Sequence, residues 1–332
     1  MSLFSSLRSA GSLPVEGHVP GFDGATGWLN SPPLTAADLQ GKVVLTDFWT
    51  YTCINWLRTL SYVRAWYEKY KDEGLIVVGV HTPEFPFERD IDNVRRAAQQ
   101  MQVEYPIAVD SDYAVWRAFA NHYWPAVYIA DAEGRIRHHQ FGEGGYGECE
   151  MVVQRLLREA GDDDAPDDVV AVAGDGLEAQ ADWANLESPE TYLGYEQGVN
   201  FASPGRDALD ERTTYELPDA LRLNQWALAG DWTIGRRACA SNTAEARLAF
   251  RFHARDLHLV LKPGDTSVPF RVTLDGEAPG DTHGTDIDEA GNGVASDPRL
   301  YQLVRQSGRV EERTFEITFL EQGIEAYVFT FG

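Results

Sequence analysis

The stretch between residues 43 and 56 constrains the fold of this chain most strongly. Residues 43–49 begin as a short apolar run after Gly41 and are rich in β-forming side chains, which predicts a buried strand. Residues 57–71 carry apolar side chains at helical spacing, which predicts a helix. Cys53 therefore lies where a strand passes into a helix. The positive end of the helix dipole favours the thiolate, so this pattern predicts a reactive cysteine.

The segment 47–66, which contains Cys53, resembles the active-site strand, turn and helix of thioredoxins. Together with residues 79–85 it resembles the soluble part of DipZ-type proteins, thiol–disulfide proteins related to the TlpA group. In those families the turn is Cys-x-x-Cys, whereas here it reads Cys53-Ile54-Asn55-Trp56. The resemblance implies a thioredoxin-like fold and thiol–disulfide chemistry with only the attacking cysteine retained.

The order of expected elements is that of an α/β thioredoxin-like domain over residues 1–160. Strands and helices alternate and then end in a hairpin and a final helix. The expected strands are 43–49, 75–80, 106–109, 126–130 and 136–141, and the expected helices are 55–72, 88–101, 112–120 and 148–160. Resemblance to TlpA-like proteins adds a small hairpin within residues 15–40.

The second half of the chain has a different periodicity. An acidic run at 162–168 indicates a linker, expected over residues 161–187. Beyond it, short segments alternate apolar and polar side chains between turns, which predicts an antiparallel β-sandwich over residues 188–332. This region resembles the carboxyl-terminal domain of DipZ-type proteins, which is similar to carbohydrate-binding modules of jelly-roll type.

Charge and hydropathy restrict the partners. The 332 residues carry a net charge of −24, which argues against nucleic acid and anionic membrane surfaces. No apolar run approaches the ~20 residues of a membrane-spanning helix, and residues 1–14 show no apolar core of a signal peptide. DipZ-type proteins usually carry a preceding membrane domain and act outside the cytoplasm. The chain is thus expected to be a stand-alone relative or a part of such a protein, with its localisation open.

Five residues carry the expected thiol chemistry. Cys53 matches the attacking position, and Trp56 stands where the resolving cysteine would be, with its bulk expected beside or over the sulfur. Asp47 matches the buried carboxylate behind the thioredoxin active site, where burial raises the pKa of an acid toward neutrality. The resemblance implies a cis peptide bond between Trp124 and Pro125, facing the thiol.

Further residues are weaker candidates for this site. Glu84 follows the adjacent strand, so it is expected at the same edge of the sheet, as a thiol contact or as an exposed loop acid. Trp49, Tyr51 and Trp124 are candidates for an aromatic collar, although aromatic side chains in such places often only pack. Cys149 is expected too far from the thiol site to resolve a disulfide, which needs Cα atoms within roughly 7 Å.

The sandwich offers candidate sugar and metal contacts. Aromatic side chains could stack on sugar rings, although most tryptophans in a sandwich are core; the candidates are Trp226, Trp232, Tyr192, Tyr195 and Tyr301. Asp286 and Asp288 lie in a loop rich in oxygen donors that could hold calcium, but the loop departs from the EF-hand pattern. A polar turn is the favoured interpretation, and neither a metal nor another cofactor is expected.

Three functional hypotheses remain open at this point. The first is a monothiol thioredoxin-like protein, acting on protein or low-molecular-weight thiols and disulfides, or redox-silent. The second is a one-cysteine peroxidase, because Thr50 and Cys53 match part of the peroxiredoxin motif, although Thr46 stands where that motif has proline. The third is a protein that binds a glycan or an envelope partner through the sandwich.

Overall fold

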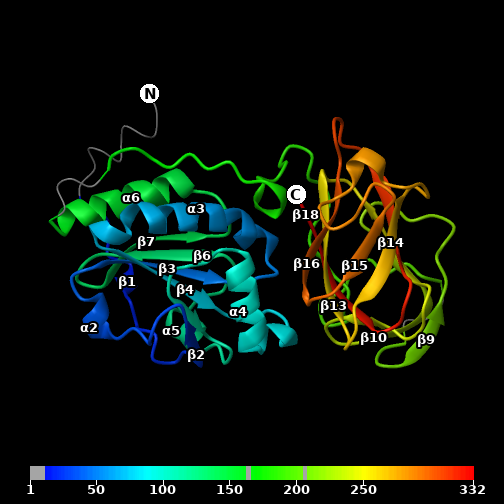
Figure 1. The fold of residues 1–332 in the computed structure, drawn as a ribbon, viewed down its shortest axis with the longest axis horizontal. Coiled ribbons are helices and arrows are strands. Elements are labelled where there is room, and N and C mark those ends of the chain that lie inside the picture. The colour runs from blue at the N-terminus through cyan, green and yellow to red at the C-terminus, as the bar shows by residue number, and fades with distance from the viewer. Residues whose placement is uncertain (1–11, 162–165, 205–207) are drawn as a thin grey trace. The chain divides into compact units, whose positions relative to one another are not determined.

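The computed structural model describes residues 12–161, 166–204 and 208–332. The chain divides into two compact units, residues 1–173 and 174–332 (Figure 1). Residues 162–165 of the expected linker and residues 1–11 lie outside the described residues. Among the described residues, no helix has both the length and the apolar character needed to cross a membrane.

The first unit is built on a seven-stranded mixed sheet with strand order β1-β7-β6-β3-β4-β5-β2. The strands are β1 (Gly17–His18), β2 (Gly27–Leu29), β3 (Val43–Trp49), β4 (Leu75–His81), β5 (Ile107–Val109), β6 (Ala126–Ala130) and β7 (Arg135–Phe141). Central strand β3 pairs parallel with β4 and antiparallel with β6. All seven of its residues are buried, which agrees with the mostly apolar sequence of this strand.

Helices cover both faces of this sheet. They are α2 (Ala36–Leu39), α3 (Ile54–Tyr70), α4 (Ile91–Gln100), α5 (Ala114–Ala118) and α6 (Tyr146–Glu159). Figure 1 shows α3 and α6 side by side on one face, with α2 and α5 on the other. A thioredoxin-like α/β domain was expected, and the fold confirms it.

Two local expectations in this unit were wrong. The segment 15–40 does not form a hairpin, because β1 pairs with β7 and β2 pairs with β5, at opposite edges of the sheet. The expected helix 88–101 is divided into the 3-10 helix η2 (Pro86–Arg89) and α4. Asp90 separates them because it is extended and its side chain caps α4, accepting a hydrogen bond from the backbone of Asp92 at 2.9 Å.

The second unit is all-β. Its main strand order is β15-β14-β17-β12-β10-β11-β18-β13-β16, and the strand pairings are antiparallel. The strands are β8 (Thr191–Tyr192), β9 (Arg212–Tyr215), β10 (Trp226–Ile234), β11 (Cys239–Ser241), β12 (Ala246–Phe252), β13 (Asp256–Pro263), β14 (Val268–Leu274), β15 (Asn292–Ala295), β16 (Arg299–Arg305), β17 (Arg313–Phe319) and β18 (Ile324–Phe331).

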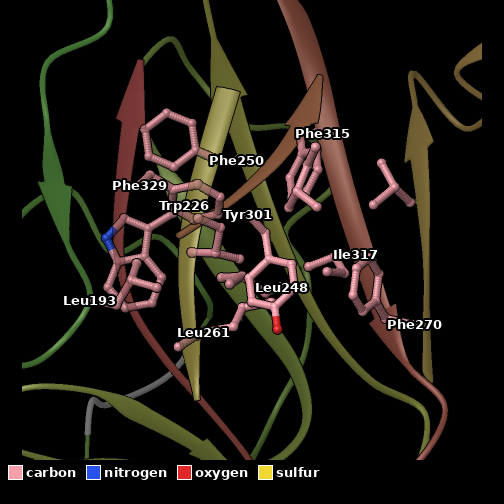
Figure 2. Close-up of a cluster of buried hydrophobic side chains, with 14 of the residues drawn as sticks. Leu193, Trp226, Leu248, Phe250, Leu261, Phe270, Tyr301, Phe315, Ile317 and Phe329 are labelled. Carbon is pink, nitrogen blue, oxygen red and sulfur yellow. The ribbon is translucent and has the colours of Figure 1, made fainter. Parts of the chain in front are cut away.

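The sheet consists of two halves that share strand β10: β15-β14-β17-β12-β10 and β10-β11-β18-β13-β16. An apolar core lies between these halves. Figure 2 shows side chains from both halves meeting in it. Phe250 on β12 lies 4.9 Å from Phe329 on β18, between ring centroids, and Phe315 on β17 lies 5.8 Å from Phe329. The alternating pattern of the sequence therefore corresponds to a sandwich whose inward side chains interdigitate.

Part of the segment expected as a linker packs on the first unit. The backbone carbonyl of Asp168 accepts hydrogen bonds from Lys69 on α3 and Gln154 on α6. The backbone N–H of Val170 donates to the buried carboxylate of Glu150 at 2.8 Å. Residues 168–170 are thus held against the two helices that cover one face of the sheet.

Candidate active site

Cys53 lies at the N-cap of α3, immediately after the turn that follows β3. Its backbone N–H donates to the carbonyl of Thr50 at 3.2 Å, and its own carbonyl accepts from Leu57 at 3.0 Å, which starts the helix. Cys53 is partly exposed, whereas Thr52 and Ile54 on either side are buried. None of the three cysteines is in a disulfide. This partly exposed cysteine therefore lies at the positive end of a 17-residue helix.

Trp56 points into the interior of the unit. Its side chain is fully buried, and its indole ring stacks on Trp49 with ring centroids 4.3 Å apart and an angle of 21° between the planes. The indole N–H donates to Oδ2 of Asp47 at 2.9 Å. The tryptophan therefore occupies the space between α3 and the sheet, and Cys53 keeps its partial exposure.

Asp47 is a fully buried acid within β3. Burial raises its pKa to about 7, against the hydrogen bond from Trp56, which lowers it. Gly79 is its partner in register on β4. A Cβ atom at Gly79 would lie 2.8 Å from Nε1 of Trp49 and 2.9 Å from the ring of Tyr105, so only glycine lets both aromatic rings pack there.

His81 ends β4 and is also fully buried. Its ring meets the edge of Trp49 at 4.8 Å and stacks on Tyr51 at 5.6 Å, between centroids. Burial lowers its pKa to about 3, so the imidazole is neutral near physiological pH. Trp49 and Tyr51 belong to this buried aromatic layer below the turn, and not to an exposed collar.

The Trp124–Pro125 peptide bond is cis, the geometry that the resemblance implies. Pro125 is buried and precedes β6, whose first residue pairs with Phe48 of β3. The indole N–H of Trp124 donates to the carbonyl of Thr82 at 3.1 Å. These contacts place Pro125 beside the end of the strand that leads to Cys53.

Glu84 and Glu88 lie in the loop and 3-10 helix after β4. Glu84 is partly exposed, and its backbone N–H donates to Oε2 of Glu88 at 2.7 Å. Glu88 is fully buried; Oε1 accepts from the hydroxyl of Thr52 at 2.6 Å, and Oε2 also accepts from the backbone of Phe85 at 2.8 Å. Burial raises the pKa of Glu88, and these hydrogen bonds oppose the rise.

Glu88 was not among the candidate residues that the sequence indicated. A signal was present, because Pro86 opens the 3-10 helix and Glu88 stands at its third position. An acid at that position commonly reaches back to the backbone N–H at the helix start, as Glu88 does to Phe85. The hydrogen bond to Thr52 could not be seen, since it joins residues 36 positions apart.

Cys149 and Cys239 have the environments of structural cysteines. Cys149 is buried on α6 with its sulfur 3.6 Å from Nε2 of His138, and burial raises its pKa to about 12. Cys239 is buried in the second unit, where its thiol donates to the carbonyl of Leu193 and burial raises its pKa strongly. Neither thiol ionises readily enough to act as a resolving nucleophile.

Most of the sugar-contact candidates are core residues. Trp226, Trp232 and Tyr301 are buried, and each donates its polar hydrogen to a backbone carbonyl of the same unit. Tyr192 is half-buried, and Tyr195 is 38% exposed, with its hydroxyl donating to Asp210. The interpretation of the first three as ligand contacts is therefore corrected, because they fill the sandwich interior.

The oxygen-rich loop is held together by its own hydrogen bonds. Asp286 accepts from Arg299 at 2.6 Å and from the backbone of Gln302 at 2.7 Å. Asp288 accepts from the backbone and side chain of Asn292. Within the described residues no group of three or more His, Cys, Asp or Glu side chains could hold a metal ion. These contacts are those of a polar turn.

Comparison with known proteins matches both units to families. Residues 16–139 match the AhpC/TSA family, and residues 188–332 match a family described as the thioredoxin-like C-terminal domain. Protein DipZ of Mycobacterium tuberculosis is 36% identical over 97% of this chain and 44% of its own length. The chain thus spans less than half of that relative.

A shorter relative is covered almost completely. The thiol–disulfide oxidoreductase YkuV of Bacillus subtilis is 34% identical over 42% of this chain and 95% of its own length. Among solved structures, a thioredoxin-like protein in the oxidized form is 34% identical, with a TM-score of 0.41, covering 44% of this chain and 99% of that one.

Proposed function

This chain belongs to the DipZ-like group of thioredoxin-like thiol–disulfide oxidoreductases, and we propose that it acts as a monothiol member of that group. Cys53 attacks a disulfide of a protein or of a low-molecular-weight thiol and holds the product as a mixed disulfide. An external thiol, and not a second cysteine of the chain, then releases it.

One observation carries this proposal: Cys53 is partly exposed at the start of α3, while Trp56 is turned inward. Because the indole is held by Trp49 and Asp47 inside the unit, the thiol keeps the environment that favours a thiolate. The position of the resolving thiol is filled by a side chain that cannot attack a disulfide.

The proposed reaction needs only thiols and disulfides. The Cys53 thiolate forms a bond to one sulfur of the substrate disulfide, the S–S bond of the substrate breaks, and the other sulfur leaves as a thiolate. An external thiolate then attacks the mixed disulfide, forms a new disulfide with the substrate sulfur and releases the Cys53 thiolate. Over the cycle the external thiolate replaces one thiolate of the substrate disulfide, so the number of disulfide bonds is unchanged. A second external thiol is needed to reduce the substrate fully to two thiols.

The experiment exposes the reduced full chain to oxidised glutathione and identifies the modified cysteine by peptide mass spectrometry. We expect a glutathione adduct on Cys53 alone, removed by added reduced glutathione and absent in Cys53→Ser. No adduct on Cys53 of a folded protein would show that the site is redox-silent and would overturn the proposal.

Trp56→Cys is the matched variant, and it should gain the ability to resolve the mixed disulfide within the chain. Restoring Cys-x-x-Cys should let the protein release its own mixed disulfide as an internal disulfide, so that the glutathione adduct disappears at least tenfold faster without added thiol. Trp56→Ala opens the same space without a thiol and should retain the adduct. Equal adduct lifetimes in the two variants would contradict the expectation.

A peroxidase is the second candidate, favoured by the match of residues 16–139 to the AhpC/TSA family. Thr46 stands at the proline position of the peroxiredoxin motif, and it pairs with both neighbours of β3 in the middle of the sheet, where proline is excluded. Hydrogen peroxide consumption at catalytic rates, lost in Cys53→Ser, would establish this alternative; slow oxidation at the rate of a free thiol would exclude it.

Glycan binding by the second unit is not part of the proposal. Its large aromatic candidates are buried in the core, and Tyr195 is bonded to Asp210.

A further inference from the structure

Glu88 connects two segments of the chain: the turn that contains Cys53, and the loop that follows β4. One carboxylate oxygen accepts from the hydroxyl of Thr52, the residue before Cys53, and the other accepts from the backbone N–H groups of Glu84 and Phe85. The three bonds measure 2.6, 2.7 and 2.8 Å. In all three bonds the carboxyl group is the acceptor, which favours its ionised form and opposes the rise in pKa that burial causes.

Burying a carboxylate costs more free energy than burying a neutral polar group that makes the same connection. Glu88 is fully buried, and the interactions that oppose the effect of burial on its pKa are hydrogen bonds from uncharged donors. Burying an acid without a cation costs free energy unless its hydrogen bonds compensate. A neutral amide could accept the same two backbone hydrogen bonds, so a carboxyl group at this position differs from an amide mainly in the charge that it carries once ionised.

That charge lies close to the thiol. Glu88 bonds to the residue next to Cys53, and consecutive Cα atoms are about 3.8 Å apart, so the carboxylate lies within roughly 10 Å of the sulfur. A negative charge at that distance opposes formation of the thiolate, whereas the start of α3 favours it. A less stable thiolate is also a poorer leaving group from a mixed disulfide.

We propose that Glu88 is a positioning residue for Cys53: it fixes the turn against the Glu84–Phe85 backbone, and its charge opposes ionisation of the thiol. Mixed disulfides at Cys53 are therefore released more slowly than the helix start alone would allow. This inference rests on the proposed function only in its consequence for mixed disulfides; its effect on the thiol can be measured without any substrate.

Other titratable groups lie around this end of the sheet. His81 ends β4, Asp47 lies within β3, Glu84 follows β4, and Asp110 follows β5, where it accepts from the hydroxyl of Thr82 at 3.2 Å. His81 is neutral because burial lowers its pKa to about 3. Asp110 is held by the backbone N–H groups of Val115 and Trp116 in α5. Asp47 and Glu84 are the remaining groups whose effects on Cys53 must be separated from that of Glu88.

The test measures the pKa of Cys53 from the Cβ resonance of full-length protein labelled with ¹³C-cysteine, assigned by its absence in Cys53→Ser. Glu88→Gln keeps the shape and the backbone acceptor. We expect it to lower the pKa of Cys53 by roughly 0.5 to 1 unit. Glu84→Gln, in the same loop but partly exposed, should shift it by less than half as much.

Two outcomes would overturn the inference: no change in Glu88→Gln, or an equal shift in Glu84→Gln. Measuring Glu88→Gln again in an Asp47→Asn background should give the same shift, since Asp47 is bonded to Trp56 and not to the turn. A shift that vanishes there would assign the effect to Asp47.

A measurement in the unsubstituted protein covers the case in which Glu88→Gln fails to fold. The carboxyl resonance of Glu88 should show a second inflection at the pH where Cys53 ionises, and Cys53→Ser should abolish it. Absence of that inflection would overturn the inference. If Cys53 forms no glutathione adduct and the shift in Glu88→Gln still appears, only the proposed function fails.

Discussion

Trp56 changes the role of the acid behind it. In a dithiol site a buried acid can move a proton for the second thiol. Here Asp47 instead accepts a hydrogen bond from the indole N–H of Trp56, and the indole does not ionise in the relevant pH range. Asp47 thereby becomes a hydrogen-bond acceptor whose burial still raises its pKa to about 7. Its remaining effect is on stability as a function of pH.

The first prediction concerns Asp47→Asn. Because the pKa is raised from 3.8 to about 7 on folding, the contribution of Asp47 to stability is fully present below pH 4 and is lost as the pH rises through 7. Asparagine does not titrate and keeps an oxygen for Trp56. The free energy of unfolding of the variant relative to wild type should rise by about 2 kcal/mol between pH 5.5 and pH 8.

Urea denaturation of both proteins at the two pH values measures this difference, and the other titrating groups cancel in the comparison. A difference that is constant with pH, or that falls as the pH rises, would show that Asp47 stays ionised in the folded protein.

At the scale of elements, a buried ion pair ties α3 to the segment before α6. Nη1 of Arg58 lies 2.9 Å from Oε1 of Glu143, and the two side chains are 1% and 7% exposed. Burial raises the pKa of Glu143, and the guanidinium opposes that rise. Such a pair holds two elements in register, because removing one partner leaves a buried charge without its counter-charge.

The second prediction follows from this pair. Glu143→Ala should lower the free energy of unfolding by about 3 kcal/mol, whereas the double variant Arg58→Met with Glu143→Leu should recover most of the loss. Urea denaturation of the single and double variants measures both values. The prediction fails if Glu143→Ala costs less than 0.5 kcal/mol, on the order of an exposed pair.

At the scale of the whole molecule, each unit has an apolar core of its own. The second unit buries a continuous set of aromatic and aliphatic side chains between the halves of its sheet (Figure 2). A core of this kind is what a domain needs in order to fold alone.

The third prediction is that residues 174–332 fold without the rest of the chain. The isolated unit should unfold cooperatively on heating and keep the near-ultraviolet circular dichroism of Trp226 and Trp232, whose rings are held in the core. Residues 1–173, prepared in the same way, serve as the comparison. A broad transition without near-ultraviolet signal would mean that this unit depends on the first.

The sequence alone determined the class of both units and the position of the thiol. The apolar run of β3, the helical spacing after Cys53 and the alternation in the second half depend on neighbouring residues, so their periodicity is readable without a structure. The edge strands β1 and β2 were not readable in this way, because they are short and their partners lie far along the chain.

Only the tertiary structure decided how the site is built. The inward turn of Trp56, the link from Glu88 to Thr52 and the burial of Trp226 and Trp232 all depend on contacts between segments far apart in the sequence. A residue type limits which bonds a side chain can form, but the fold decides which partners reach it. For this reason the sequence placed Cys53 at a helix start, and the structure alone brought Glu88 to its neighbour.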